Sequence, residues 1–406
     1  MGDTLPLSSI KVLEVASWVF VPAAGAVLAE WGAEVIKVEN ASGGDPQRGL
    51  VSSGFVPSGS VNHLFEIPNR GKKSVAVDLK HPEGREVVLE IARNCDVFTT
   101  NLLPQQRSGL GLDVEDIRSV NSRIVYAIGS GTGESGPEAG KGGFDLSTYW
   151  ARSLASSATP PGVTHPVNMP AAGFGDLTAG LALAGGIALA LFHRERTGQS
   201  VVVDNSLLGT AAWSAAINVI GAAVTGREAQ QQWNRRDAPN PLVNYYRTSD
   251  ERFLHLNMLQ ADRWWPDLAR ALGRPDLASD PRWVERPRGV PAPQIVDLLD
   301  EIFATRSLSD WCEALSCLSG GAVWEPVKTP SEVAVDPQLR ANSLIREISV
   351  DGAAAPIVAA PVRIAGSAEP NDRCAPGLGE HTDDVLLGLG FTMEQVIDLK
   401  ISGALL

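Results

Sequence analysis

The sequence predicts an α/β fold in which helices cover both faces of a mainly parallel sheet. Short apolar strands alternate with helical segments over the first 200 residues, and this alternation is typical of parallel sheets. An uncharged apolar run at residues 177–192 predicts a buried helix. The sequence changes near residue 226 to a polar stretch and then a tryptophan-rich segment, which predicts a separate smaller domain.

The first forty residues predict a strand, a helix and a second strand. Pro22 stands near the first turn of the predicted helix, where its missing N–H costs little, and Gly32 ends it. The pattern then repeats along the chain. The predicted strands are residues 10–15, 34–38, 74–79, 96–100, 123–128 and 201–204, and the predicted helices are 22–31, 82–93, 114–120 and one that begins near Asn205.

The predicted domains follow from these changes in pattern. We expect a large domain over residues 1–225, a small domain over 226–325, and a return of the chain to the large domain over 326–406. The small domain contains a strand, FLHLNML, and several helices, and the chain closes with an amphipathic helical tail.

Composition excludes several classes of protein. The net charge of −13 over 406 residues argues against a nucleic-acid partner. Four cysteines without a CxxC pair predict free thiols in a reducing cytoplasm, and the scattered histidines predict no metal site. The polar N-terminus predicts no signal peptide, and the run at 177–192 is shorter than the roughly 20 residues of a membrane span.

Two local patterns have competing interpretations. GTGESG, residues 131–136, matches GxGxxG, but Pro137 and the glycines after it oppose the helix that a dinucleotide site requires, which favours a loop. NRGKKSVAVDLK, residues 69–80, brings four basic residues together. It predicts either a solvated turn before a strand or a phosphate-binding surface.

Asp176 is the candidate for chemistry, because it heads the long apolar run. An aspartate in this place most often caps its own helix. A helix N-terminus also keeps a carboxylate ionised, and an ionised carboxylate in a desolvated site is a nucleophile. The flanking glycines Gly173, Gly175 and Gly180 would let a substrate approach the backbone closely, which favours the second interpretation.

Four blocks in order along the chain resemble the class III CoA-transferases, the family of formyl-CoA transferase, carnitine CoA-transferase and α-methylacyl-CoA racemase. The blocks are IKVLEV…GAEVIKVE with GGDPQRG, NRGKKSVAVDLKHPEGRE, GFGDLTAG…ALFHRERTGQSVVVDNSLL, and GEHTDDVLLGLG. The resemblance implies a Rossmann-like large domain built from both chain ends, a smaller inserted α+β domain and an interlocked homodimer.

The resemblance also implies a reaction. CoA would move from an acyl-CoA thioester to a free carboxylic acid, with coenzyme A as the carried group and no metal. Asp176 falls on the family's nucleophilic aspartate, which forms an anhydride and then an aspartyl-CoA thioester. Backbone N–H groups of loops 129–136 and 173–175 are expected to stabilise the oxyanion. The residues expected at the CoA site are Ser17, Trp18, Val19, Phe20, Val77, Lys80, Asn101, Leu102, Arg107 and Phe144.

Departures from the family pattern narrow the CoA contacts, reactions and substrates that the resemblance implies. Two family arginines are absent, and Arg107, displaced by two residues, is the expected substitute. Phe144 replaces the histidine of racemase members and cannot move a proton, which disfavours the alternative of an α-methylacyl-CoA racemase. Segment 233–244 lacks the glycines of a family lid, which disfavours small oxalate-like acids. Trp18, Phe20 and Trp150 would suit a larger or ring-containing acyl group. A non-catalytic CoA-binding paralogue is the second alternative.

Overall fold

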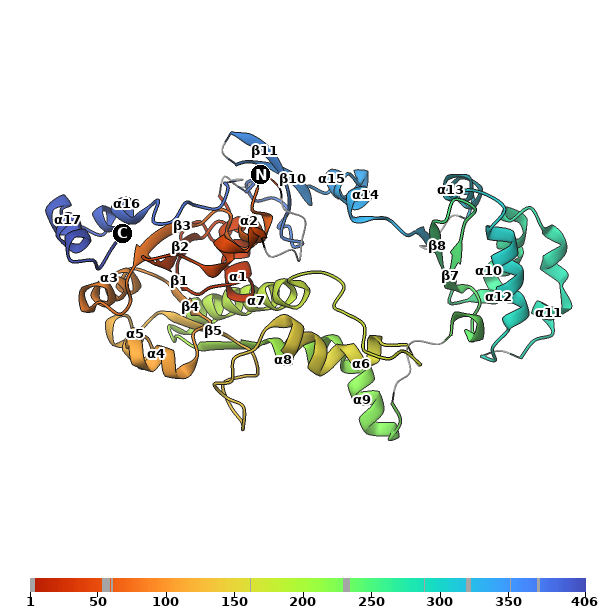
Figure 1. Ribbon diagram of the computed structural model, residues 1–406, viewed down its shortest axis with the longest axis horizontal. Coiled ribbons are helices and arrows are strands. Elements are labelled where there is room, and N and C mark those ends of the chain that lie inside the picture. The colour runs from red at the N-terminus through yellow and green to blue at the C-terminus, as the bar shows by residue number, and fades with distance from the viewer. Residues whose placement is uncertain are drawn as a thin grey trace. The chain divides into compact units, whose positions relative to one another are not determined.

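The computed structural model describes residues 4–52, 59, 61–160, 162–228, 234–287, 289–318, 323–350, 352–370 and 373–406 (Figure 1). The chain divides into two compact units. The large unit comprises Met1–Ser156, Asn168–Gly226 and Pro337–Leu406, and the small unit comprises Ser157–Val167 and Arg227–Asp336.

A six-stranded parallel sheet forms the centre of the large unit, as the alternating pattern predicts. The strand order is β3-β2-β1-β4-β5-β6, so the chain reverses its direction of travel across the sheet between β1 and β4. Ligands of such open sheets bind outside the carboxyl ends of the strands at this reversal. The strands are β1 (Lys11–Val15), β2 (Glu34–Asn40), β3 (Lys73–Val77), β4 (Val97–Thr100), β5 (Val125–Ser130) and β6 (Val202–Ser206).

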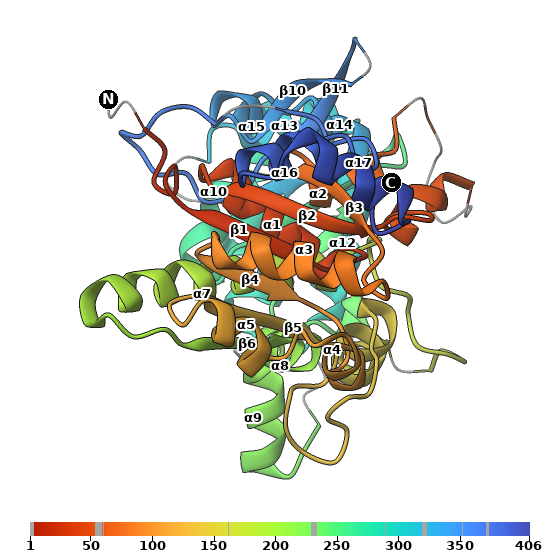
Figure 2. The same ribbon diagram turned by 90° about the vertical axis from the view of Figure 1, so that its left-hand side faces the viewer.

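Helices cover both faces of this sheet. On one face α1 and α7 pack together in a core with Phe20, Leu183 and Ile187, and on the other α3, α5, α16 and α17 surround Phe98 and Tyr126. Figure 2 shows α3, α5 and α16 in front of the strands. The helices of the N-terminal part are α1 (Phe20–Glu30), η1 (Pro46–Ser52), α2 (His63–Asn69), α3 (Pro82–Arg93), α4 (Pro104–Leu110), α5 (Val114–Val120), η2 (Asp145–Leu154), α6 (Ala155–Ala158), α7 (Phe174–Thr197), α8 (Leu207–Ser214) and α9 (Ala216–Thr225).

The C-terminal part of the chain belongs to the large unit. Leu405 forms an antiparallel bridge with Val77 at the end of β3, which places the chain end beside an N-terminal strand. This part contains α15 (Pro337–Ala341), the antiparallel pair β10 (Ile345–Val350) and β11 (Ala353–Val358), α16 (Thr382–Gly388) and α17 (Met393–Ile401).

The small unit has its own core around a three-stranded antiparallel sheet of order β7-β8-β9. Trp265 and Trp283 stack in that core with ring centroids 4.1 Å apart. Its elements are η3 (Arg235–Asp237), β7 (Val243–Arg247), β8 (Phe253–Asn257), α10 (Ala261–Ala271), η4 (Pro275–Ser279), α11 (Pro281–Val284), α12 (Pro293–Phe303), α13 (Leu308–Leu315), β9 (Trp324–Pro326) and α14 (Pro330–Ala334).

The long apolar run forms most of α7, which is longer than expected. Among the described residues α7 is the one continuous helix long and apolar enough to cross a membrane, and α8 with α9 meets the same test as a bent pair. Core helices meet this test too, and the inner face of α7, with Leu183 and Ile187, is fully buried in the core of the large unit.

Candidate active site

A pocket of about 350 Å³ opens at the carboxyl ends of β1, β4 and β5, where the strand order reverses. It brings together residues that are far apart in the sequence, from the loops after these strands, from the N-terminal turns of α7 and α8, and from the loop before η2. The lining residues are Trp18, Phe20, Asn101, Leu102, Leu103, Pro104, Gln106, Gly129, Ser130, Gly131, Gly133, Glu134, Gly140, Lys141, Gly142, Gly143, Phe144, Asp176 and Leu207.

Asp176 lies in this pocket as the third residue of α7. The helix begins at Phe174, and Gly173, in a left-handed conformation with φ of 70°, occupies the N-cap position. Asp176 is therefore not the N-cap, and the capping interpretation of this residue is wrong. The helix N-terminus still favours a negative charge at this place.

Two of the glycines beside Asp176, Gly175 and Gly180, serve packing, so the expectation that they admit a substrate stays open only for Gly173. A Cβ on Gly175 would lie 2.5 Å from Cγ of Tyr149, and one on Gly180 would lie 2.7 Å from the carbonyl oxygen of Phe20. Both glycines let α7 approach its neighbours closely. This close packing fixes the first turn of α7, and with it the position of Asp176.

Desolvation outweighs the effect of the helix N-terminus and disfavours the ionised form of Asp176. Burial, with a further contribution from the nearby Asp145 carboxylate, raises the pKa of Asp176 to about 8. Burial also raises the pKa of Asp145, although the backbone N–H groups of Leu146 and Gly173 donate hydrogen bonds to it and oppose the shift. Strongly perturbed carboxyl groups in a pocket are typical of catalytic sites.

Two glycine-rich loops cross at the pocket wall. A Cβ on Gly131 would lie 2.9 Å from Cα of Gly143, so the two backbones meet where no side chain fits. No helix follows GTGESG, and the chain runs on as a loop to η2. This segment is a pocket loop, as the sequence favours, and lacks the helix of a dinucleotide site.

The loop between β1 and α1 forms another wall. Ser17 donates its backbone N–H to Oδ1 of Asn101 at 3.2 Å, and Nδ2 of Asn101 donates to the carbonyl oxygen of Ser17 at 2.7 Å. The indole of Trp18 meets the ring of Phe144 edge to face, with centroids 5.7 Å apart. Val19 precedes the first residue of α1. The carboxyl ends of β1 and β4 are thus joined by side-chain hydrogen bonds.

The expected CoA residues are only partly gathered at this pocket. Trp18, Phe20, Asn101, Leu102 and Phe144 line it, while Ser17 and Val19 lie in the same loop but do not line it. Val77 is buried in the core, and Lys80 is exposed beyond β3. Neither Val77 nor Lys80 lines the described pocket, nor does Trp150.

Arg107 is engaged by acidic side chains. Its guanidinium, 6% exposed, pairs with Glu134 and with Asp113 at 3.3 Å, and donates to the carbonyl oxygen of Leu102 at 3.3 Å. Glu134 and Leu102 both line the pocket. Arg107 thus connects two walls of the pocket from behind, and its charge is already compensated.

Three of the four basic residues at 69–80 pair with acids and Lys80 is exposed beyond β3, which disfavours a phosphate-binding surface built from the whole cluster. Lys72 is fully buried against Glu14 at 2.7 Å, Arg70 pairs with Glu30 at 2.8 Å, and Lys73 pairs with Glu34 at 2.7 Å.

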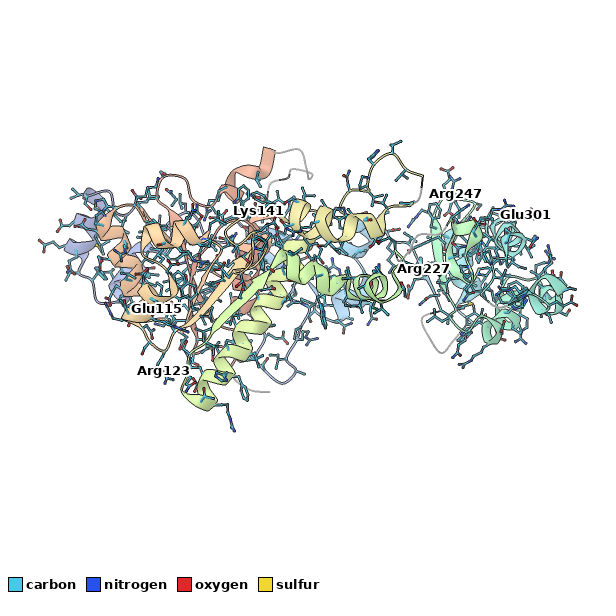
Figure 3. The ribbon with its side chains drawn as sticks, turned by 90° about the horizontal axis from the view of Figure 1, so that it is seen from below. Glu115, Arg123, Lys141, Arg227, Arg247 and Glu301 are labelled. Carbon is cyan, nitrogen blue, oxygen red and sulfur yellow. The ribbon has the colours of Figure 1, made fainter. Side chains whose placement is uncertain are left out.

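The sequence analysis singled out neither of two charged residues of the pocket, Lys141 and Glu134. Lys141, labelled in Figure 3, lines the pocket with a side chain that is 61% exposed and lies 2.8 Å from Glu138. Glu134 lines it as the partner of Arg107. Their place in a glycine-rich loop directly after a parallel strand was the available signal. Within the described ranges, no group of three or more histidine, cysteine or acidic side chains is arranged to hold a metal.

Comparison with known proteins decides the family. The model of CoA-transferase family III matches residues 7–382. The chain belongs to this family. The (R)-2-hydroxy-4-methylpentanoate CoA-transferase of Clostridioides difficile is 30% identical, with 98% of each chain covered. The cinnamoyl-CoA:phenyllactate CoA-transferase of Clostridium sporogenes is 29% identical, covering 98% of this chain and 97% of its own.

Solved structures agree with this assignment. The crystal structure of Rv3272 from Mycobacterium tuberculosis has a TM-score of 0.80 at 27% identity, and that of a CaiB/BaiF family protein from Brucella suis has 0.80 at 25%; each comparison covers 95% of this chain and 100% of the other. The protein is therefore a family III CoA-transferase with a mixed α/β fold around a parallel sheet. Its substrates are a CoA thioester and a carboxylic acid.

Proposed function

We propose that this CoA-transferase moves CoA from an acyl-CoA to a free carboxylic acid through covalent intermediates on Asp176. The observation that carries the proposal is a half-buried carboxylate in the pocket, fixed in the first turn of a core helix. An anhydride and an aspartyl thioester both hydrolyse readily, so the nucleophile that forms them needs a site from which water is largely excluded.

The proposed steps use only the carboxylate of Asp176 and the two substrates. The carboxylate attacks the thioester carbonyl and expels CoA thiolate, which leaves a mixed anhydride. The thiolate then attacks the carbonyl carbon of Asp176, releases the donor acid and leaves aspartyl-CoA. The acceptor carboxylate attacks this thioester, and the expelled thiolate takes the acyl group from the new anhydride to give product acyl-CoA and free Asp176.

We assign stabilisation of the oxyanion to the carboxyl end of β5 and the residue that follows it. Gly129, Ser130 and Gly131 line the pocket together with Asp176, and backbone N–H groups at such a place stabilise charge that develops on a carbonyl oxygen. None of residues 173–175 lines the pocket, and the N–H of Gly133 donates to Oγ of Ser130 at 3.0 Å. Among the loops expected to act, residues 129–131 therefore have the better support.

We further propose that one of the two acids carries an aromatic or branched side chain. Trp18, Phe20, Phe144 and Leu207 give the pocket that contains Asp176 part of an apolar lining. Such a lining favours a bulky apolar group over a small dicarboxylic acid by the area it buries. The names of two relatives, which act on cinnamoyl-CoA with phenyllactate and on (R)-2-hydroxy-4-methylpentanoate, support the same class.

We also propose that the enzyme is a homodimer. The side chains of Trp213, Ile217 and Val224 on α8 and α9 are 83%, 88% and 80% exposed, and α9 has no buried residue. A helix this apolar needs a partner, because contiguous exposed apolar patches mark interaction surfaces. A second copy of the chain is the partner that the family resemblance implies.

Peptide mass spectrometry after mixing with acyl-CoAs tests the mechanism. With cinnamoyl-CoA we expect a CoA or acyl adduct on the peptide that contains Asp176, and hydroxylamine should remove it. Asp176→Asn should abolish both the adduct and turnover. Asp310 is also the third residue of its helix, α13, and lies outside the pocket, so Asp310→Asn is the matched control and should retain both.

The alternatives give different results. A racemase would exchange the α-proton of a 2-methylacyl-CoA with deuterium from solvent and form no adduct. A binding-only paralogue would bind CoA without adduct or exchange. Either pattern, obtained with folded protein across a panel of aromatic, branched and short acyl-CoAs, would refute the covalent mechanism.

A further inference from the structure

Trp18 has a backbone conformation that its residue type disfavours. Its φ is 69°, in the left-handed region where the Cβ of a bulky residue is crowded by the backbone. Such conformations persist only where the surroundings impose them, and they concentrate at functional sites. Here the strained residue lines the pocket that contains Asp176.

Asp45 imposes this conformation from outside the pocket. Its Oδ1 accepts the backbone N–H of Trp18 at 3.1 Å, and its Oδ2 lies 2.9 Å from Nζ of Lys37. Lys37 also donates to the carbonyl oxygen of Ala16 at 2.8 Å and to Oε1 of Glu14 at 3.1 Å. The side chains of Glu14, Lys37 and Asp45 are all completely buried.

Lys37 stays protonated despite its burial. Burial alone would lower the pKa of Lys37, but the Glu14, Asp45 and Glu39 carboxylates raise it above its usual value. The N–H of Trp18 is thus held by the same Asp45 side chain that pairs with Lys37.

The position of the indole follows from this backbone. With φ positive, the Cβ of Trp18 points to the opposite side from the one it would take in an extended loop. The ring then meets Phe144 edge to face at an interplanar angle of 89°. Asp45 itself does not line the pocket, so any influence on the substrate passes through Trp18.

We infer that Asp45 is a positioning residue that holds the indole of Trp18 against Phe144 and thereby sets the preference of the pocket for bulky over small acyl groups. The inference rests on the proposed function for the nature of the ligand. Asp45 also accepts the N–H of Gln47 at 3.0 Å, which is a purely local role that the test must separate from positioning.

Calorimetric titration with two thioesters tests the inference. The dissociation constants of cinnamoyl-CoA and acetyl-CoA are measured on chains that carry Asp176→Asn, which prevents turnover. We expect Asp45→Asn to reduce the preference for cinnamoyl-CoA about tenfold, because the amide offers one acceptor oxygen in place of two and cannot hold both the N–H of Trp18 and the ammonium group of Lys37. The ratio of two dissociation constants does not depend on the fraction of the sample that is folded.

Measuring Asp45→Asn in chains that also carry Trp18→Gly separates an effect on the indole position from an effect on folding. Trp18→Gly adopts positive φ without strain and has no side chain to place, so Asp45→Asn should change the preference by less than about twofold there. Asp45→Glu keeps the charge but moves the oxygens, and it carries the same expectation if Asp45→Asn does not fold. Glu30→Gln is the control, since Glu30 is a buried acid on α1 paired with Arg70 away from the pocket.

Two results would overturn the inference. One is an unchanged preference in both Asp45 variants, and the other is an equal change in the native and Trp18→Gly backgrounds. Failure of the proposed function would show elsewhere, as absence of the hydroxylamine-sensitive adduct on chains with native Asp176. The binding preference is measured without turnover and does not depend on that outcome.

Discussion

The carboxylate of Asp145 adds to burial in raising the pKa of Asp176 to about 8. Asp145 begins η2 and is itself 8% exposed, with one carboxylate oxygen, Oδ2, that has no hydrogen-bond partner. Two acidic groups in a poorly solvated place resist simultaneous ionisation. The π-helix η2 therefore contributes to the reactivity of a residue on a different helix, α7.

The pH dependence of the reaction should follow from this pair. If ionised Asp176 is the nucleophile, kcat/KM should fall about tenfold per pH unit below an apparent pKa near 8. Asp145→Asn removes the like charge, which lowers the pKa of Asp176 and moves the acidic limb of the pH profile, where kcat/KM falls, to lower pH. Initial rates with a single acyl-CoA from pH 5 to 9 measure both profiles.

Glu138→Gln provides a control for that shift. Glu138 precedes η2 and pairs with Lys141 at 2.8 Å, but its carboxylate is not among the groups that affect Asp176. Removing the Glu138 charge should therefore leave the acidic limb of the kcat/KM profile at the same pH. An acidic limb near pH 4 in the native protein, or one that Asp145→Asn does not move, would contradict the assignment of this limb to Asp176 and its neighbour Asp145.

The raised pKa also predicts that Asp176 destabilises the fold. Between pH 4 and 8 the folded chain retains a proton on Asp176 that the unfolded chain releases, so its contribution to stability decreases as pH rises through this window. Asp176→Asn should therefore increase the free energy of unfolding at pH 8 by about 1–3 kcal/mol, allowing for partial solvent access, and by much less at pH 5.

Urea unfolding of both proteins at pH 5 and pH 8 measures this difference. Asp310→Asn, at the same helical position in α13, keeps an acceptor oxygen for Ser307 but loses the charge that favours a helix N-terminus, so it should be slightly destabilised at both pH values. An Asp176→Asn variant that is less stable than the native protein at pH 8 would show that the carboxylate stabilises the fold.

The sequence predicted several elements closely because their ends are marked locally. The helices expected at residues 82–93 and 114–120 are observed as Pro82–Arg93 and Val114–Val120; the first begins with a proline and the second follows Asp113, and both are typical of a helix start. The π-helix η2 was not predicted, since its spacing is not the 3.6-residue repeat that defines the usual helical pattern.

The site was predicted less completely, for reasons of tertiary structure. Asp176 was identified from its place before an apolar run, but its helix begins two residues earlier, at Phe174, where no capping side chain marks the start. Arg107 was expected at the CoA site, yet its partner Glu134 lies 27 residues further along the chain and meets it only in the fold. Local sequence contains no signal for such a pair.

Replacing Gly175 or Gly185 of α7 by alanine should change the stability of the protein in opposite directions. At Gly175 the new Cβ would lie 2.5 Å from Cγ of Tyr149, so Gly175→Ala should cost about 1–3 kcal/mol of stability and reduce turnover by moving Asp176. Gly185 has no atom within 4 Å of such a Cβ, so Gly185→Ala should gain up to about 1 kcal/mol from helix propensity alone. Thermal unfolding and initial rates compare the two, and equal effects would argue against the packing described for Gly175.

The apolar surface of α8 and α9 predicts the oligomeric state. Ile217 is 88% exposed at the second residue of α9, and in a dimer this surface would be covered. Ile217→Glu would place an unpaired charge in that interface, which is strongly unfavourable, so a dimer should become a monomer. Ile401, 80% exposed on α17, offers the same substitution as a control and should leave the assembly intact. Light scattering coupled to gel filtration gives the masses; a native protein of 43 kDa, or an Ile217→Glu dimer, would exclude this surface as the interface.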